Sequence, residues 1–257
     1  MTPDKARALV IRAVPFGETS AVVTLFAREF GKVRALAKGA WRPKSAFDGA
    51  LDLLSCCQVL VLRRQRGGLD LLTEAFLGRR FRVASSLPAF HGGMYVAELL
   101  DALTADADPQ PELFDAADTA LSRLSGHRGP DAVVWPIVVG FEVAALRAAG
   151  QMPAFVRCAE CGVAPPAAAR QAFGMLDGGL LCPRCRRGRR TVASVTTETL
   201  AALAACAAPL RPGAPAPAPF DPSLEGEARA VMNTLVAHAI GRRSRLAPCL
   251  VPRPARR

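Results

Sequence analysis

The chain has little of what enzyme active sites ordinarily use. Its 257 residues include only three histidines, at positions 91, 127 and 238, and none lies in an HExxH motif or beside a candidate nucleophile. The sequence also lacks a Gly-x-x-x-x-Gly-Lys-Ser/Thr phosphate loop and a Gly-x-Gly-x-x-Gly dinucleotide turn. A zinc deaminase would need His-x-Glu, which is absent. We therefore expect a protein that is not an enzyme and has no small-molecule substrate.

Long apolar segments are missing as well. No uncharged apolar run reaches the length that spans a bilayer, and the chain does not open on an apolar secretory segment. Eight cysteines in such a chain fit a reducing cytoplasm better than an oxidising compartment. We expect a cytoplasmic protein without membrane contact.

Positive charge, by contrast, is abundant and unevenly placed. The formal net charge is +11 and the pI is about 10.0. Residues 1–80 carry 14 Lys/Arg and 7 Asp/Glu, residues 81–157 carry 5 and 9, and residues 158–257 carry 14 and 6. Two basic blocks thus flank an acidic middle. This pattern favours a polyanionic partner, nucleic acid before a membrane surface.

Four of the cysteines have the spacing of a metal site. Cys158 and Cys161 form one Cys-x-x-Cys pair, Cys182 and Cys185 form another, and residues 162–181 separate them. Each pair can form a tight turn that points two sulfurs at one Zn²⁺, which accepts four thiolates tetrahedrally. Four thiolates leave no position for water, so we predict one structural zinc. The alternative is that these are ordinary buried or disulfide-bonded cysteines.

The first part of the chain reads as β-structure. Alternating apolar residues and turn signals predict five strands, at Arg7–Val14, Ala21–Ala27, Val33–Ala40, Leu54–Leu62 and Leu69–Phe76. Five short strands suit an OB-fold barrel over residues 1–78. An SH3-like barrel would give a similar pattern.

From residue 79 the apolar spacing becomes helical. We predict an α-helical domain over residues 79–257, with a zinc module at 155–190 inserted in it. The whole is an α+β multidomain protein.

The predicted barrel carries the candidate nucleic-acid contacts. Five cations fall within thirteen positions, Trp41 lies among them and could stack on a base, and three arginines form a second basic turn. We predict DNA binding by Lys32, Arg34, Lys38, Trp41, Arg42, Lys44, Arg63, Arg64 and Arg66. The alternative is a solvated charged face with Trp41 covering the core.

Several segments resemble the RecO recombination mediators of bacterial DNA repair. The most specific is residues 38–45, Lys-Gly-Ala-Trp-Arg-Pro-Lys-Ser, which is similar to the family's basic segment, although Trp41 replaces a position that is often basic. The opening of the chain resembles the opening of the family, and residues 241–246 resemble its final helix motif. Both cysteine pairs resemble those of the zinc-binding members.

The resemblance implies an OB-fold followed by a helical domain with a zinc module. It implies that the protein binds single- and double-stranded DNA and anneals complementary strands. It also implies that the protein, together with RecR, helps to load RecA onto DNA coated by single-strand-binding protein (SSB). It also implies contact with the SSB C-terminal tail and a place near the nucleoid.

Two rival functions remain open at this point. A zinc-dependent nucleic-acid enzyme would show turnover that depends on Cys182. A zinc-ribbon RNA-binding or interaction protein would prefer structured RNA to single-stranded DNA.

Overall fold

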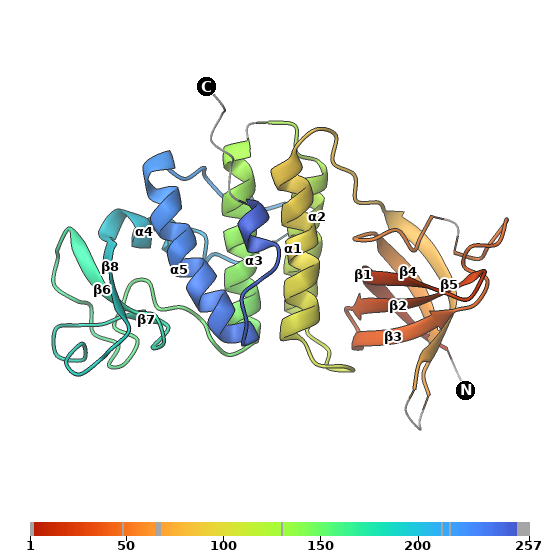
Figure 1. Ribbon diagram of the computed structural model, residues 1–257, viewed down its shortest axis with the longest axis horizontal. Helices are drawn as coiled ribbons and strands as arrows, with labels where there is room; N and C mark the ends of the chain where they lie inside the picture. The colour runs from red at the N-terminus through yellow and green to blue at the C-terminus, as the bar shows by residue number, and fades with distance from the viewer. Residues whose placement is uncertain are drawn as a thin grey trace.

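A computed structural model describes residues 3–47, 49–64, 68–129, 131–211, 213–215 and 217–250. It consists of a β-barrel at one end, a group of helices in the middle and a small three-stranded sheet at the other end (Figure 1). No described helix is both long and apolar enough to cross a membrane.

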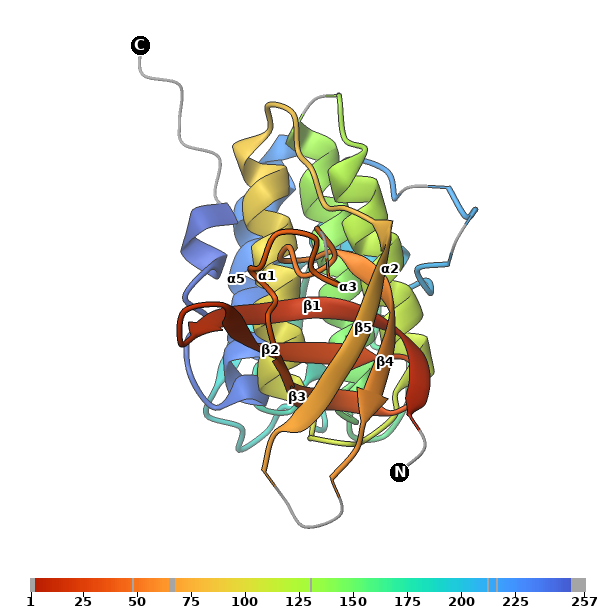
Figure 2. The same cartoon turned by 90° about the vertical axis from the view of Figure 1, so that its right-hand side faces the viewer.

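The first part of the chain forms a closed five-stranded barrel, as the sequence predicts. Its strands follow the spatial order β1-β2-β3-β5-β4, and Figure 2 shows them in front of the helices. All neighbours pair antiparallel except β3 and β5, which are parallel. The strands are β1 (Asp4–Phe16), β2 (Ser20–Ala27), β3 (Gly31–Ala37), β4 (Cys56–Leu62) and β5 (Asp70–Arg79).

Alternation of side chains explains the barrel. Small and β-branched residues at every second position fill its interior, among them Ala8, Val10, Val23 and Val59. The opposite faces of β1 and β2 point outward, and there Leu9 and Phe26 join the helical core instead. The barrel is therefore joined to the helices by a continuous apolar core.

The helical part begins soon after the barrel. Its helices are α1 (Leu87–Leu103), α2 (Pro111–Ser125), α3 (Val134–Ala148), α4 (Thr197–Ala205) and α5 (Pro222–Ile240), with short 3₁₀ turns at Asp131–Val133 and Ala247–Leu250. Ser86, Thr196 and Asp221 cap the N-termini of α1, α4 and α5 with their side-chain oxygens.

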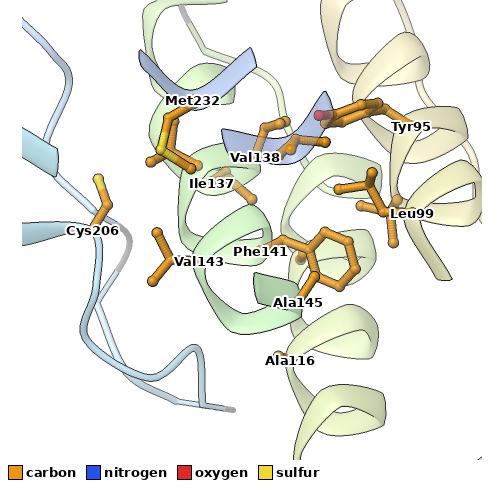
Figure 3. Close-up of a cluster of buried hydrophobic side chains, with 14 of the residues drawn as sticks. Tyr95, Leu99, Ala116, Ile137, Val138, Phe141, Val143, Ala145, Cys206 and Met232 are labelled. Carbon is orange, nitrogen blue, oxygen red and sulfur yellow. The ribbon is translucent and has the colours of Figure 1, made fainter. Parts of the chain in front are cut away.

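The core of the helical part is centred on α3, most of whose residues are buried. Figure 3 shows Tyr95 and Leu99 of α1 on one side of Ile137 and Phe141 of α3, with Met232 of α5 on the other. A helix that is apolar on all sides needs neighbours on all sides. The position of α3 between α1, α2 and α5 meets that need.

The small sheet lies between α3 and α4 in the sequence. Its strands are β6 (Arg170–Gly174), β7 (Gly179–Leu180) and β8 (Val192–Thr196), in the order β7-β6-β8. A turn at residues 175–178 joins the antiparallel strands β6 and β7. The third strand, β8, follows an arginine-rich segment, residues 184–190, and pairs along the whole of β6.

Ion pairs join the barrel to the helices. The Asp118 carboxylate of α2 accepts hydrogen bonds from Arg7, at 2.7 Å, and from Arg79. Arg28 donates two hydrogen bonds of 2.9 Å to Asp115, in the bidentate geometry that is strongest for this pair. The acidic middle of the chain thus neutralises part of the basic barrel.

The barrel and helices also meet through their backbones. The N–H of Ala107 donates to the carbonyl of Lys32 at 2.8 Å. A Cβ at Gly31 would collide with the backbone of Asp108. A side chain at position 31 would therefore separate β3 from the segment between α1 and α2.

A carboxyl group is fully buried in the helical core. The Tyr95 hydroxyl donates to Glu142 Oε1 at 2.7 Å, and the other carboxyl oxygen has no protein partner in the described structure. Burial raises the pKa of Glu142 to about 7, although Tyr95 and the charge of Arg229 act in the opposite direction. Between these two pKa values, 4.5 in the unfolded chain and about 7 in the folded protein, the folded protein therefore holds a proton that the unfolded chain has already released.

We expect the Asp118→Ala variant to be less stable by about 1–2 kcal/mol, because two arginines lose a shared, partly buried partner. Denaturant titration measures this change. Glu74→Gln, at an exposed position on β5, is the matched control and should change stability by less than about 0.5 kcal/mol. Equal stability of the two variants would contradict the role given to Asp118.

The pH dependence of stability provides a second test. Because the pKa of Glu142 is raised from 4.5 to about 7, the folded state binds more protons than the unfolded state between these values. Stability contributed by this site should thus fall as pH rises through that window. Glu142→Gln removes the titration, so thermal unfolding of this variant should depend less on pH. An unchanged pH profile would show that Glu142 does not titrate there.

Candidate metal centre and nucleic-acid interface

The four predicted cysteines meet at one point. One sulfur from each of Cys158, Cys161, Cys182 and Cys185 lies within 4.8 Å of all the others. A tetrahedral ion with metal–sulfur bonds of about 2.3 Å would hold the sulfurs about 3.8 Å apart. The separation of the Cys161 and Cys182 sulfurs is 3.8 Å. This quartet could hold a metal ion.

Local backbone geometry positions these sulfurs. In the first turn, the N–H of Gly162 donates to the Cys158 carbonyl at 2.9 Å, and Gly162 has a φ of +72° that favours glycine. In the second turn, the N–H of Arg186 donates to the Cys182 carbonyl at 2.9 Å. The N–H of Ala159 bonds to the Leu180 carbonyl of β7, and this bond fixes the first turn against the second.

The surroundings of Cys158 and Cys182 favour their thiolate forms. Burial disfavours ionisation of Cys158, but the backbone N–H groups of residues 182, 161 and 160 outweigh it and lower the pKa to about 6. The backbone N–H of Cys185 lowers the pKa of Cys182. Hydrogen bonding to Cys182, together with burial, raises the pKa of Cys185 to about 12. Thiolates are the form in which cysteine binds metal.

One arginine braces the module from outside. Arg189 donates to Glu160, beside the first cysteine pair, and pairs with Asp177 in the β6–β7 turn, each at 2.7 Å. It therefore connects the first turn to the hairpin. At least this member of the arginine-rich segment has a structural role.

The basic loop after β3 is exposed. Lys38, Arg42 and Lys44 all lie at the surface, and Trp41 is 50% exposed. The loop is tied back to the barrel, because the N–H of Trp41 donates to the Thr19 carbonyl at 2.8 Å. Trp41 is therefore not buried as a lid over the barrel core, and its indole is available to a ligand.

The structure places Lys32 away from this loop. The side chain is buried, and its ammonium donates to the Asp101 carbonyl at 2.7 Å and lies 3.6 Å from the Asp101 carboxylate. Lys32 belongs to the contact between barrel and helices, where a phosphate has no access to it. Arg34, next on that face of β3, is exposed and lies 4.0 Å from Asp106.

The second basic turn has mixed roles. Arg63 is partly buried, pairs with Asp70 at 3.0 Å and lies over the Phe30 ring. Arg64 is exposed. Arg66 lies outside the described residues.

Two exposed residues of β1 were not among the predicted contacts. Arg12 and Phe16 are both at the barrel surface, and Phe16 is 57% exposed. The available signal was strand alternation, which places residues 12, 14 and 16 on one face. The DNA contacts were predicted from the density of cations alone, which is highest in and around the loop after β3.

We expect the purified protein to carry about one metal ion per chain, and Cys182→Ser to lose most of it. Elemental analysis measures the metal content, and chelation should lower the unfolding temperature of the unaltered protein only. Cys249→Ser, at an exposed cysteine outside the quartet, is the matched control and should keep its metal. Full metal content in the Cys182 variant would refute this ligand set.

Comparison with known proteins agrees with this architecture. Residues 1–81 match the family described as "Recombination protein O N terminal", and residues 84–245 match "Recombination protein O C terminal". The proteins called "DNA repair protein RecO" include similar chains from several bacteria. That of Rhodopirellula baltica is 42% identical over 181 residues, covering 70% of this chain and 66% of the relative.

Other relatives match along most of their length. The Myxococcus xanthus protein is 35% identical over 237 residues, 92% of each chain, and that of Anaeromyxobacter dehalogenans is 36% identical over 254 residues, 95% and 94% of the two chains. The barrel and the helical part with its cysteine module thus match one family. This chain belongs to the RecO family.

Proposed function

We propose that this protein is a DNA-binding recombination mediator in DNA repair. It binds single- and double-stranded DNA, anneals complementary strands and, with RecR, helps to load RecA onto SSB-coated single-stranded DNA. The observation that carries the proposal is the exposed basic loop on a closed five-stranded barrel, in a chain of the RecO family.

Phosphates are the natural ligands of this loop. The side chains of Lys38, Arg42 and Lys44 are exposed within seven positions of one another, on a backbone held by the bond from Trp41 to Thr19. Such a cluster attracts the DNA backbone without reading base sequence, so binding should weaken with salt. A surface of this kind also lowers the repulsion between two strands, which is the physical requirement of annealing.

We assign the cysteine quartet to one zinc ion with a structural role. The four cysteine sulfurs would fill all four positions of a tetrahedral zinc ion and leave none for water or substrate. When bound, the ion would hold the two turns and the hairpin together. In this proposal the protein is not an enzyme, and it acts by binding DNA and proteins in the cytoplasm, near the nucleoid.

The helical part is the proposed site for protein partners. We assign to it the contact with the acidic, apolar C-terminal tail of SSB. A groove lined by Phe81, Phe90 and Met94, with Arg82 and Arg128 beside it, has matching chemistry. RecR is the second protein partner of the proposed mechanism.

Reversing three loop charges tests the DNA-binding assignment. We expect Lys38→Glu/Arg42→Glu/Lys44→Glu to weaken binding to single-stranded DNA at least about 10-fold and to flatten the salt dependence by about two in log–log slope. Fluorescence anisotropy across a salt titration measures both. Circular dichroism should show an unchanged fold, since all three side chains are exposed.

A second triple reversal controls for net charge. Arg186→Glu/Arg187→Glu/Arg190→Glu changes the net charge equally, at exposed positions of the cysteine module. A smaller loss of DNA affinity in this variant than in the loop variant would place the main DNA contact on the barrel. Wild-type affinity of the loop variant at every salt concentration would overturn the assignment, and tighter binding of structured RNA than of single-stranded DNA would favour an RNA-binding function.

A further inference from the structure

The core of the helical part contains a buried acceptor and a buried donor without partners. Glu142 of α3 is fully buried, and its Oε2 has no partner among the described residues, because Tyr95 of α1 donates only to Oε1. Figure 3 shows Tyr95 reaching from α1 toward α3. Arg229 of α5 is 9% exposed, and its Nε–H also lacks a partner in the described structure. Unsatisfied buried polar atoms are costly, so the core favours any state in which both are satisfied.

The two groups influence each other without forming a hydrogen bond through these atoms. Burial has the largest effect on each pKa, but the charge of Arg229 lowers the pKa of Glu142 and the charge of Glu142 raises the pKa of Arg229. The Arg229 guanidinium lies over the ring of Trp135, 4.1 Å from its centroid. Trp135 and Glu142 are seven residues apart on α3, so they share one face of the helix. Arg229 thus has two alternative partners on α3.

The arrangement in the structure suits an uncharged Glu142. An ionised carboxylate in a closed core needs a cation or several hydrogen-bond donors, and here the donor is the Tyr95 hydroxyl alone. A neutral carboxyl group has no such need, so Arg229 can remain on the indole. Ionisation would place a negative charge beside Arg229 and make the carboxylate its more favourable partner.

We propose that Arg229 is a two-position switch controlled by the proton on Glu142. With the proton present, the guanidinium stacks on Trp135, as in the structure. When the proton leaves for solvent, the guanidinium turns to the Glu142 carboxylate and forms a buried ion pair, and the indole loses its cation. The exchange satisfies Oε2 of Glu142 and Nε of Arg229 together.

The other ionisable groups around Glu142 keep their charge near neutral pH. Burial raises the pKa of Tyr95, and burial together with the charge of Glu142 raises the pKa of Cys206, after α4, to about 12. Glu98 of α1 stays ionised, since hydrogen bonds from residues 242–246 lower its pKa although burial opposes them. The buried residues of α2 include no ionisable side chain. Burial raises the pKa of Glu142 itself to about 7, so the switch operates near neutral pH.

The exchange would change the wall of a cavity. Trp135 and Arg229 line a cavity of about 170 Å³ together with Leu250, which is buried in the C-terminal 3₁₀ turn. Asp131 and Glu225 line it as well, and the charge of Glu225 favours the charged form of Arg229. Arg229 therefore stays a cation in both positions. Its departure from Trp135 would enlarge the space beside Leu250 and loosen the seat of the last turn.

Fluorescence of Trp135 tests the exchange. Trp41→Phe leaves Trp135 as the only tryptophan of the full-length chain. We expect its emission to shift between about pH 5 and about pH 9, with a midpoint near 7. In this background, Glu142→Gln should keep the emission of the acidic form at every pH, and Arg229→Met should abolish the shift. Emission independent of pH in the folded protein would refute the switch. A shift that persists in Arg229→Met would show that the indole senses Glu142 directly, and would also refute it.

A double-mutant cycle at two pH values gives an independent readout. Denaturant titration compares the unaltered protein with Glu142→Gln, Arg229→Met and the double variant. The coupling between the two positions should be small at about pH 5 and should reach about 10-fold in the unfolding equilibrium constant at about pH 9. A general loss of packing would not produce this pH dependence. Equal coupling at both pH values would show that Arg229 keeps one arrangement and would overturn the proposal.

Histidines near the cavity provide the controls, because they also titrate near neutral pH. His127 Nε2 lies 3.8 Å from Asp131, and His91 Nδ1 lies 3.0 Å from the carbonyl of Cys249, next to Leu250. His127→Gln and His91→Gln should leave the midpoint and the size of the Trp135 shift unchanged. Loss of the shift in either variant would assign the titration to that histidine and rule out the role given to Glu142.

Discussion

The contact between the barrel and the helices is the constraint on which the other features depend. Carboxylates at positions 101, 115 and 118 hold cations of the barrel, and Leu9 and Phe26 extend the helical core into it. Ion pairs of this kind are partly shielded from solvent, so they persist better at high salt than contacts at an open surface. The basic residues of the barrel thus fall into two sets. One set pairs with carboxylates of the helical part and maintains the structure, and the other remains exposed to solvent.

This sorting explains the charge pattern of the chain. An acidic middle between two basic blocks could signal a binding site for a basic partner. Here much of that acidity is used within the molecule, at Asp101, Asp115 and Asp118. The barrel can carry many cations because some of their mutual repulsion is cancelled by α2 and the end of α1. The cysteine module follows a similar rule, since Arg189 is held between Glu160 and Asp177.

Local patterns predicted much of this architecture. The five strands follow from period-two alternation, and the quartet of sulfurs follows from two Cys-x-x-Cys pairs, because both signals lie in short stretches of sequence. What could not be predicted depends on contacts between distant segments. Lys32 reads as one more cation of a basic cluster, and only the approach of Asp101 makes it a buried, structural residue. The strand β8 was missed because the second cysteine turn and the arginine-rich segment separate it from its partner β6.

The close approach at Gly31 has a mechanical consequence. The backbone of Gly31 lies directly against that of Asp108, with no side chain between them. The ion pairs of Arg7 and Arg28 connect the same two parts of the molecule. The barrel and the helices are therefore held together by both a close backbone contact and ion pairs. In the proposed mediator, this contact would give DNA bound to the barrel a constant orientation relative to a protein bound to the helices.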